Sequence, residues 1–130
     1  MLDHGVAAPE MRSAVGCYIR LLDEMEAQLA ETPWLAGASF GNADTAAAPF
    51  LTRIDHLGMG ALIAARPRAQ AWLGRVQARP AFARAVTDVI PAAVVENFEV
   101  VSATGKTVMT RLTLSPLPFT HAYTSAMSVA

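Results

Sequence analysis

The chain has 130 residues, 53% of them hydrophobic, and a formal net charge of −1, which suffices for one domain with its own core but not for two. This near-neutral charge argues against partners recognised by strong overall charge, such as nucleic acid or an acidic membrane surface. The single cysteine, Cys17, excludes an intrachain disulfide. Because the first ten residues also lack the pattern of a secretion signal and no apolar run is long enough to span a membrane, the sequence predicts a cytoplasmic protein.

Residues 1–8 form a lead-in with little pattern, and Pro9 suits the first turn of a helix that ends near Thr32 and Pro33. Along this helix, apolar residues recur at steps of four and three and form one seam: Met11, Val15, Tyr18, Leu22, Met25 and Leu29. Such a seam could face a helix of another chain. Packing within the same chain is favoured, because fewer than three heptads are sustained. Cys17 lies mid-helix without a neighbouring cation, so we expect a semi-buried, inert thiol.

The stretch from Trp34 to Asp55 predicts the central helix of a bundle. Gly41 stands at the expected N-cap and Asp44 at the third helical position, where a carboxylate can accept from the free N–H groups of the cap. We therefore interpret Gly41 and Asp44 as a structural helix cap, with no catalytic role. Glycine has no side chain to close the capping box, so we expect Gly41→Ser to stabilise the protein and Asp44→Ala to cost about 1 kcal/mol.

Two further helices are predicted, one beginning at Pro67 and one running from Pro80 to about residue 90. Both are rich in arginine, and no acidic residue lies between positions 66 and 84 to offset Arg66, Arg68, Arg75, Arg79 and Arg84. This composition could indicate an anion or RNA site. A solvated face is the favoured interpretation, because exposed aromatic residues are not interleaved with the arginines.

After Pro91 the helical period disappears and Ser and Thr become frequent. Residues 98–101 and 108–114 alternate loosely around a Thr104-Gly105-Lys106 turn, which suggests a weak hairpin. The alternative is that residues 91–130 form a disordered tail, since two strands without a third are marginally stable.

Candidate chemical groups are few. His4, His56 and His121 are far apart and have no second ligand at helical spacing, so no metal site is predicted. Trp34 and Trp72 are expected to be core aromatics. The sequence contains no phosphate loop, nucleophile elbow or dinucleotide fingerprint. We therefore predict no catalytic, cofactor-binding or metal residue in this chain.

Four motifs occur in an order that resembles the C-terminal all-helical domain of the glutathione S-transferase superfamily. They are Leu35-Ala36-Gly37, Ala43-Asp44, Pro67 followed by Trp72-Leu73, and Arg79-Pro80-Ala81-Phe82. The likeness covers roughly Glu10 to Val89 and implies an all-α fold, a bundle of four main helices, with an irregular C-terminal tail. The family usually has Ser or Thr where this chain has Gly41.

The resemblance also implies what this chain lacks. In the family, a separate N-terminal thioredoxin-like domain holds glutathione and activates its thiol, and the first helix of the C-terminal domain lines much of the electrophile pocket. Both are expected to be missing here. The implied function is glutathione conjugation to apolar electrophiles, with this polypeptide itself inactive and a thioredoxin-like domain or a homodimer as partner. The alternative is a non-catalytic helical module that binds other proteins.

Overall fold

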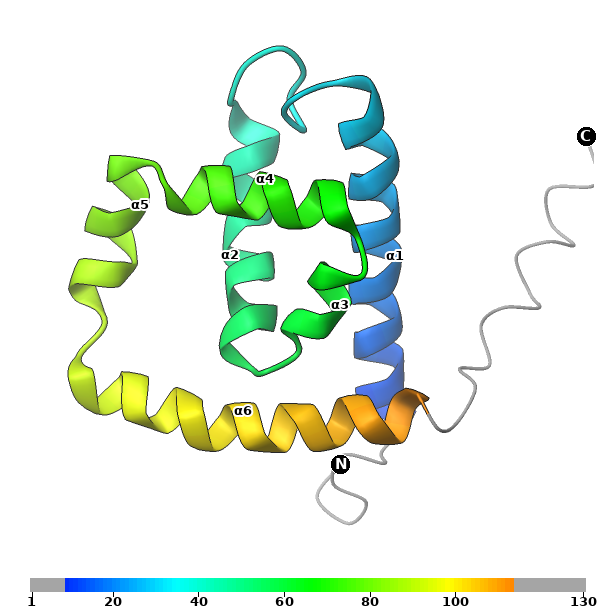
Figure 1. Ribbon diagram of the computed structural model, residues 1–130, viewed down its shortest axis with the longest axis vertical. Coiled ribbons are helices and arrows are strands. Elements are labelled where there is room, and N and C mark those ends of the chain that lie inside the picture. Colours follow the sequence, from blue (N-terminus) through cyan, green and yellow to red (C-terminus); the bar gives the residue numbers. More distant parts are fainter. Residues whose placement is uncertain (1–8, 114–130) are drawn as a thin grey trace, which may run out of the picture.

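The computed structural model describes residues 9–113, and these form six α-helices and one 3₁₀ turn. Helix α1, Pro9–Glu31, runs antiparallel to α2, Asn42–His56 (Figure 1). Val15, Leu22 and Met25 of the predicted α1 seam are buried, and Met11, Tyr18 and Leu29 pack at the edge of the same core. The seam therefore packs within this chain. Helix α2 continues through Pro49 to His56.

The core is closed by two further helices. The short α3, Gly60–Ala64, leads into α4, Pro67–Gln77, which crosses α1 and α2 (Figure 1). Trp72 of α4 is 0% exposed and is the largest fully buried side chain. It packs with aliphatic residues of every helix from α1 to α4. The predicted all-α bundle is confirmed, and no strand occurs within residues 9–113.

The helix expected to run from Pro80 to about residue 90 is shorter than predicted. It ends as α5, Pro80–Ala85, and a 3₁₀ turn, η2, follows at Thr87–Val89. Between them Val86 leaves the helical region, with φ −125° and ψ −64°. Several β-branched residues follow one another here, and Pro91 disfavours a helical conformation at the residue before it, so the helix cannot continue.

The hairpin suggested for residues 98–114 is wrong for the residues that the structure describes, because Ala92–Thr113 form a helix, α6. Phe98, Ser102 and Gly105 share one face of this helix and lie against the C-terminal end of α2. The Phe98 ring stacks on His56 at 4.4 Å between centroids. A Cβ at Gly105 would collide with the Leu57 carbonyl, and one at Gly58, where φ is +74°, would collide with the Ser102 backbone. This contact face consists largely of small residues, so the hydrophobic period does not reveal it.

Two predictions fall outside the described part of the chain: the lead-in at residues 1–8 and the tail beyond residue 113. Within residues 9–113, no helix combines the length and apolar character that a membrane span requires.

Candidate functional site

The Asp44 carboxylate joins the start of α2 to the preceding loop and to α4. Oδ1 accepts hydrogen bonds from Leu35 N at 2.8 Å and from Trp72 Nε1 at 2.7 Å. Oδ2 accepts from Gly41 N at 3.0 Å and from Ala36 N at 3.2 Å. The side chain is 0% exposed. Asp44 thus lies where the capping argument places it, but three of its four donors, Leu35 N, Ala36 N and Trp72 Nε1, come from outside the helix start.

These hydrogen bonds also set the protonation state of Asp44. Burial raises the pKa of the carboxyl, but the bonds from Trp72, Leu35, Gly41 and Ala36 outweigh it and hold the pKa below its ordinary value. The carboxylate is therefore charged at neutral pH and accepts hydrogen bonds without a proton to give. This arrangement suits a structural junction and not a general acid.

Gly41 is the N-cap of α2, but the reason for glycine there is steric. Its φ of −148° is extended backbone that any residue adopts. A Cβ added at this position would lie 2.7 Å from Ala36 Cβ. The packing therefore argues against the expectation that Gly41→Ser stabilises the protein, because the Asp44 hydrogen bonds hold the 35–41 loop against the cap. A complete two-way capping box is absent, since glycine has no side chain to accept a hydrogen bond from the Asp44 N–H.

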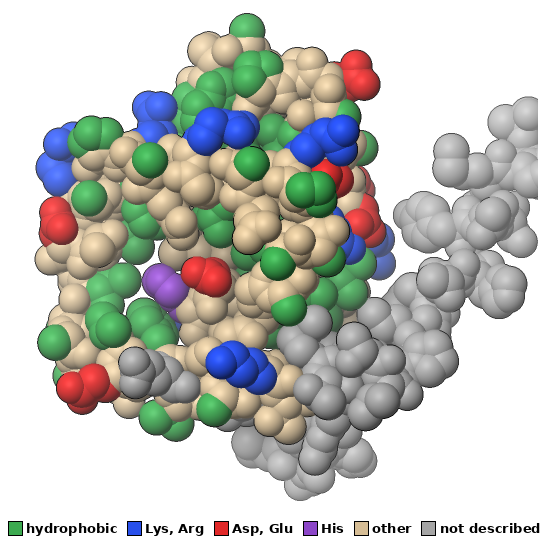
Figure 2. Space-filling view, in the orientation of Figure 1, with side chains coloured by type: hydrophobic (Ala, Val, Ile, Leu, Met, Phe, Trp, Pro, Cys, Tyr) green, Lys and Arg blue, Asp and Glu red, His purple; other side chains and the backbone are tan. Residues whose placement is uncertain are grey.

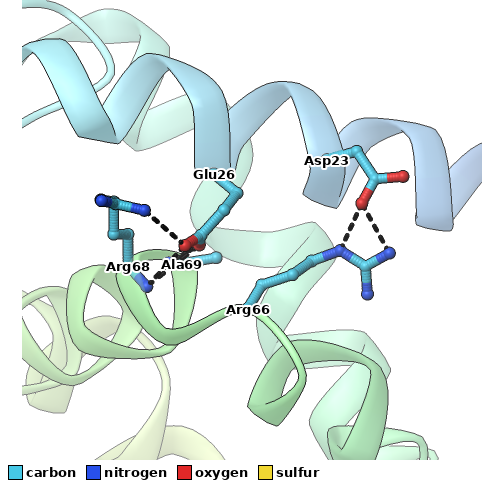
Figure 3. Close-up of polar contacts among 5 residues, drawn as sticks. All are labelled: Asp23, Glu26, Arg66, Arg68 and Ala69. Carbon is cyan, nitrogen blue, oxygen red and sulfur yellow. Dashed lines mark hydrogen bonds and ion pairs between the residues drawn. The ribbon is translucent and has the colours of Figure 1, made fainter.

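Two arginines of the basic stretch, Arg66 and Arg68, contact acidic residues of α1. Arg66 binds Asp23 through Nε at 2.7 Å and Nη2 at 2.6 Å (Figure 3). Glu26 accepts from the backbone N–H groups of Arg68 and Ala69 at 3.0 and 2.9 Å, and so caps the start of α4 from another helix. These bonds outweigh desolvation and hold the pKa of Glu26 below its ordinary value. The balancing acids lie on α1, more than 40 positions away, which is why the local sequence suggested an uncompensated charge.

Two further arginines cover half-buried aromatic rings beside the α2 start. Arg79 lies 3.9 Å from the centroid of the Phe40 ring, and Arg75 lies 5.0 Å from that of Trp34. The two rings meet edge to face at 5.3 Å. Arg75 also donates to the Pro33 carbonyl at 2.6 Å. Contacts within the domain therefore account for these two cations, as they do for Arg66 and Arg68, and an RNA site is not needed to explain them.

An apolar hollow, which we call the α2–α5 cavity, opens between α2 and the segment from α5 to Ile90. Its volume is about 500 Å³. Apolar side chains dominate its wall, including Phe40, Ala48, Phe82, Ala85, Val86 and Ile90. Figure 2 shows this face of the molecule hollowed beside α5, with hydrophobic side chains and a histidine at the edge. Sequence reasoning missed the cavity, because it assigned Phe82, Val86 and Ile90 to a continuous inward-facing helix.

A second apolar groove, the α1–α2 groove, has a volume of about 480 Å³. Leu21 and Met25 of α1 line one wall, and Ala46, Ala47 and Phe50 of α2 line the other. Phe50 is 53% exposed and lies in this groove.

Cys17 also differs from its prediction. The thiol is exposed, and Arg20 Nη2 donates to its Sγ at 3.2 Å, whereas the sequence indicated a semi-buried thiol without a cation beside it. Among the described residues, no three His, Cys, Asp or Glu side chains gather in a way that could hold a metal ion. His56 stacks on Phe98, and the other two histidines lie outside the described part.

Comparisons with known proteins agree with this architecture. Residues 8–75, from α1 through most of α4, match the family model for the C-terminal domain of glutathione S-transferase. The chain is also 34% identical over 85 residues to tetrachloro-P-hydroquinone reductive dehalogenase of Sphingobium chlorophenolicum, covering 63% of this chain and 34% of that protein. It thus spans about a third of the length of this relative. No solved structure matches the chain.

Proposed function

Because this chain belongs to the glutathione S-transferase family as a C-terminal helical domain, we propose that it is the helical half of a glutathione-dependent transferase. The other half would be a thioredoxin-like domain that binds glutathione and activates its thiol. The described residues are consistent with a domain that does not itself bind glutathione or activate its thiol. Their most buried carboxylate, Asp44, is engaged by four structural donors, and they supply an apolar wall but no thiol-activating group that we can identify.

The observation that carries the proposal is the α2–α5 cavity. A cavity of about 500 Å³ that is lined largely by apolar side chains and open to the surface is of a size and character that a ligand or a side chain of another domain can fill. We infer that the thioredoxin-like domain docks on this face and inserts a side chain into it. Docking there would bury apolar surface that the isolated chain leaves in contact with water.

The proposed substrates are apolar electrophiles that react with the glutathione thiolate. The name of the Sphingobium chlorophenolicum relative refers to a chlorinated aromatic ring, which belongs to this class of compound. The substrate would lie between the two domains, with the helical half providing the apolar wall and the thioredoxin-like half the thiolate.

Activity of the isolated chain is the first test. The purified 130-residue protein, given glutathione and chlorodinitrobenzene, should form conjugate no faster than the uncatalysed reaction. Saturable turnover by the chain alone would contradict the proposal, because it would place the thiol-activating group within these helices.

Docking is tested with a thioredoxin-like domain taken from a two-domain member of the family. Ala85→Trp fills the α2–α5 cavity and should abolish association, measured by isothermal calorimetry. Ala71→Trp is the matched control, because Ala71 is an exposed alanine of α4 that does not line the cavity. Equal affinities of the two variants would exclude the cavity as the docking site.

A stand-alone interaction module is the second candidate, and the exposure of Phe50 in the α1–α2 groove favours it. A groove between two helices fits the apolar face of a third helix, from a second copy or from another protein. Light scattering after size exclusion separates the candidates. A defined dimer that Phe50→Gln dissociates would favour the module, and a monomer would favour the transferase half.

A further inference from the structure

One buried hydroxyl group in the α2–α5 cavity has no hydrogen-bond partner among the described residues. It is Oγ1 of Thr52, a residue that lines the cavity and is 7% exposed. Buried hydroxyl groups in folded proteins almost always have a partner, because leaving one unpaired costs free energy that water would otherwise supply. The missing partner is therefore expected to arrive with whatever occupies the cavity.

A neighbouring threonine shows the usual arrangement. Thr45 lies two turns earlier on α2 and lines the same cavity. Its hydroxyl donates to the Gly41 carbonyl at 3.1 Å, as threonine commonly does to the carbonyl four residues before it. Thr52 does not bond its own helix in this way, so its hydroxyl is left for a group from outside the helix.

The rest of the wall favours an aromatic ring. Arg53, His56 and Arg79 contribute to the lining, and none of the lining residues is Asp or Glu. Arg79 already stacks on the Phe40 ring at this wall. The negative face of an aromatic ring attracts guanidinium groups, whereas an aliphatic side chain does not. The rings of Phe40 and Phe82 also line the cavity, and an aromatic ring inside it could pack against them edge to face or stacked.

We propose that the group entering the α2–α5 cavity from the thioredoxin-like domain is an aromatic side chain with a polar tip, and that its O–H or N–H forms a hydrogen bond with Thr52 Oγ1. This inference rests on the proposed function, since it names the chemistry of the side chain that docks. It distinguishes tyrosine or tryptophan from phenylalanine or leucine, which would fill the volume but leave the hydroxyl unpaired.

The test uses p-cresol and toluene, two rings that differ by one hydroxyl, and titrates each into the full chain by NMR. Thr52→Val replaces the hydroxyl with a methyl group of nearly the same shape. It should weaken p-cresol binding about fivefold, the ratio expected for one hydrogen bond, and leave toluene binding within about twofold. The shift changes should centre on the Thr52, Val86 and Ile90 methyl groups.

Thr45→Val is the matched control, because it removes a hydroxyl from the same cavity that is already bonded to Gly41. It should change the affinity of neither ring by more than about twofold. Binding of p-cresol that Thr52→Val leaves unchanged would overturn the inference, while toluene bound in the cavity would still support docking there. Failure of both rings to bind would overturn the inference and the docking site together.

Discussion

At the scale of single residues, Asp44 contributes most to the junction between α2, its preceding loop and α4. Its carboxylate accepts four hydrogen bonds and is fully buried, so its removal leaves several donors unpaired. Capping alone led to an expected cost of about 1 kcal/mol for Asp44→Ala. The hydrogen bonds from Leu35, Ala36 and Trp72 raise the expected cost of this substitution.

Asp44→Asn should therefore destabilise the protein by about 3 kcal/mol, because an amide NH₂ would face backbone donors. Urea denaturation followed by circular dichroism measures this change. Asp23→Asn is the control. It replaces an exposed carboxylate paired with Arg66 and should cost less than about 1 kcal/mol. Equal effects of the two substitutions would show that the Asp44 hydrogen bonds do not hold the junction together.

Glycine substitutions at two positions should have opposite effects. Gly41→Ser places a Cβ against Ala36 and should destabilise by about 1–3 kcal/mol. Gly74→Ala adds a methyl group in open space inside α4 and should stabilise by about 0.5–1 kcal/mol. Thermal melts of both variants measure the signs. A stabilising Gly41→Ser would mean that the 35–41 loop can move away from the cap.

The sequence was sufficient to place Gly41 at the cap and Asp44 three positions later, because capping depends on local spacing. It did not predict the Trp72 and Leu35 contacts of Asp44, which depend on how α4 and the loop pack. The unpaired hydroxyl of Thr52 could not be predicted either, since nothing in the local sequence distinguishes Thr52 from Thr45. The exposure of Cys17 also depends on which face of α1 the bundle covers.

At the scale of elements, helices with an apolar period or a proline at their start were predictable, and those that pack through small residues were not. Helix α1 shows a regular seam, and Pro67 and Pro80 mark the starts of α4 and α5. Helix α6 instead contacts α2 through Ser102 and Gly105, and the sequence pattern placed Gly105 in a hairpin turn. Gly58 and Gly105 permit the close approach because neither has a side chain.

Gly105→Ala should therefore displace α6 from α2, because the added Cβ would overlap the Leu57 carbonyl. We expect amide hydrogen exchange in residues 92–103 to accelerate at least tenfold, with exchange in α1 unchanged. Ala103→Ser, on an exposed position of the same helix, is the control and should leave exchange in both helices as it is. Unchanged protection of α6 in Gly105→Ala would show that the glycine contact does not hold this helix.

The start of α4 is predicted to be sensitive to acid through Glu26. Because the pKa of Glu26 is lowered in the folded protein, its contribution to stability is present above the unfolded pKa of about 4.3 and is lost as pH falls through the folded value. The pKa of Asp44 is also lowered in the folded protein, so its contribution to stability is likewise lost as the pH falls. The melting temperature should therefore fall as the pH is lowered from about 5 to 3.

Glu26→Gln should lower the melting temperature at pH 7 and make its decrease towards pH 3 less steep. Glu24→Gln on the same helix is the control, because Glu24 lines the α1–α2 groove and not the start of α4. Melting curves recorded across this pH range measure both effects. If the melting temperature of Glu26→Gln fell with pH as steeply as that of the native chain, Glu26 would not contribute to the acid sensitivity.

At the scale of the whole molecule, the family match and the α2–α5 cavity lead to the same interpretation. The chain matches the C-terminal domain of glutathione S-transferase and spans about a third of a curated relative. The apolar α2–α5 cavity opens to the surface beside α5. A helical half that depends on a second domain for its thiol chemistry accounts for both observations.

Calorimetric titration of glutathione into the isolated chain tests this claim most directly. If the thiol site belongs to another domain, the titration should give no saturable heat up to millimolar glutathione. Saturable binding with a micromolar Kd and one site per chain would contradict the account, because the helices would then hold glutathione by themselves.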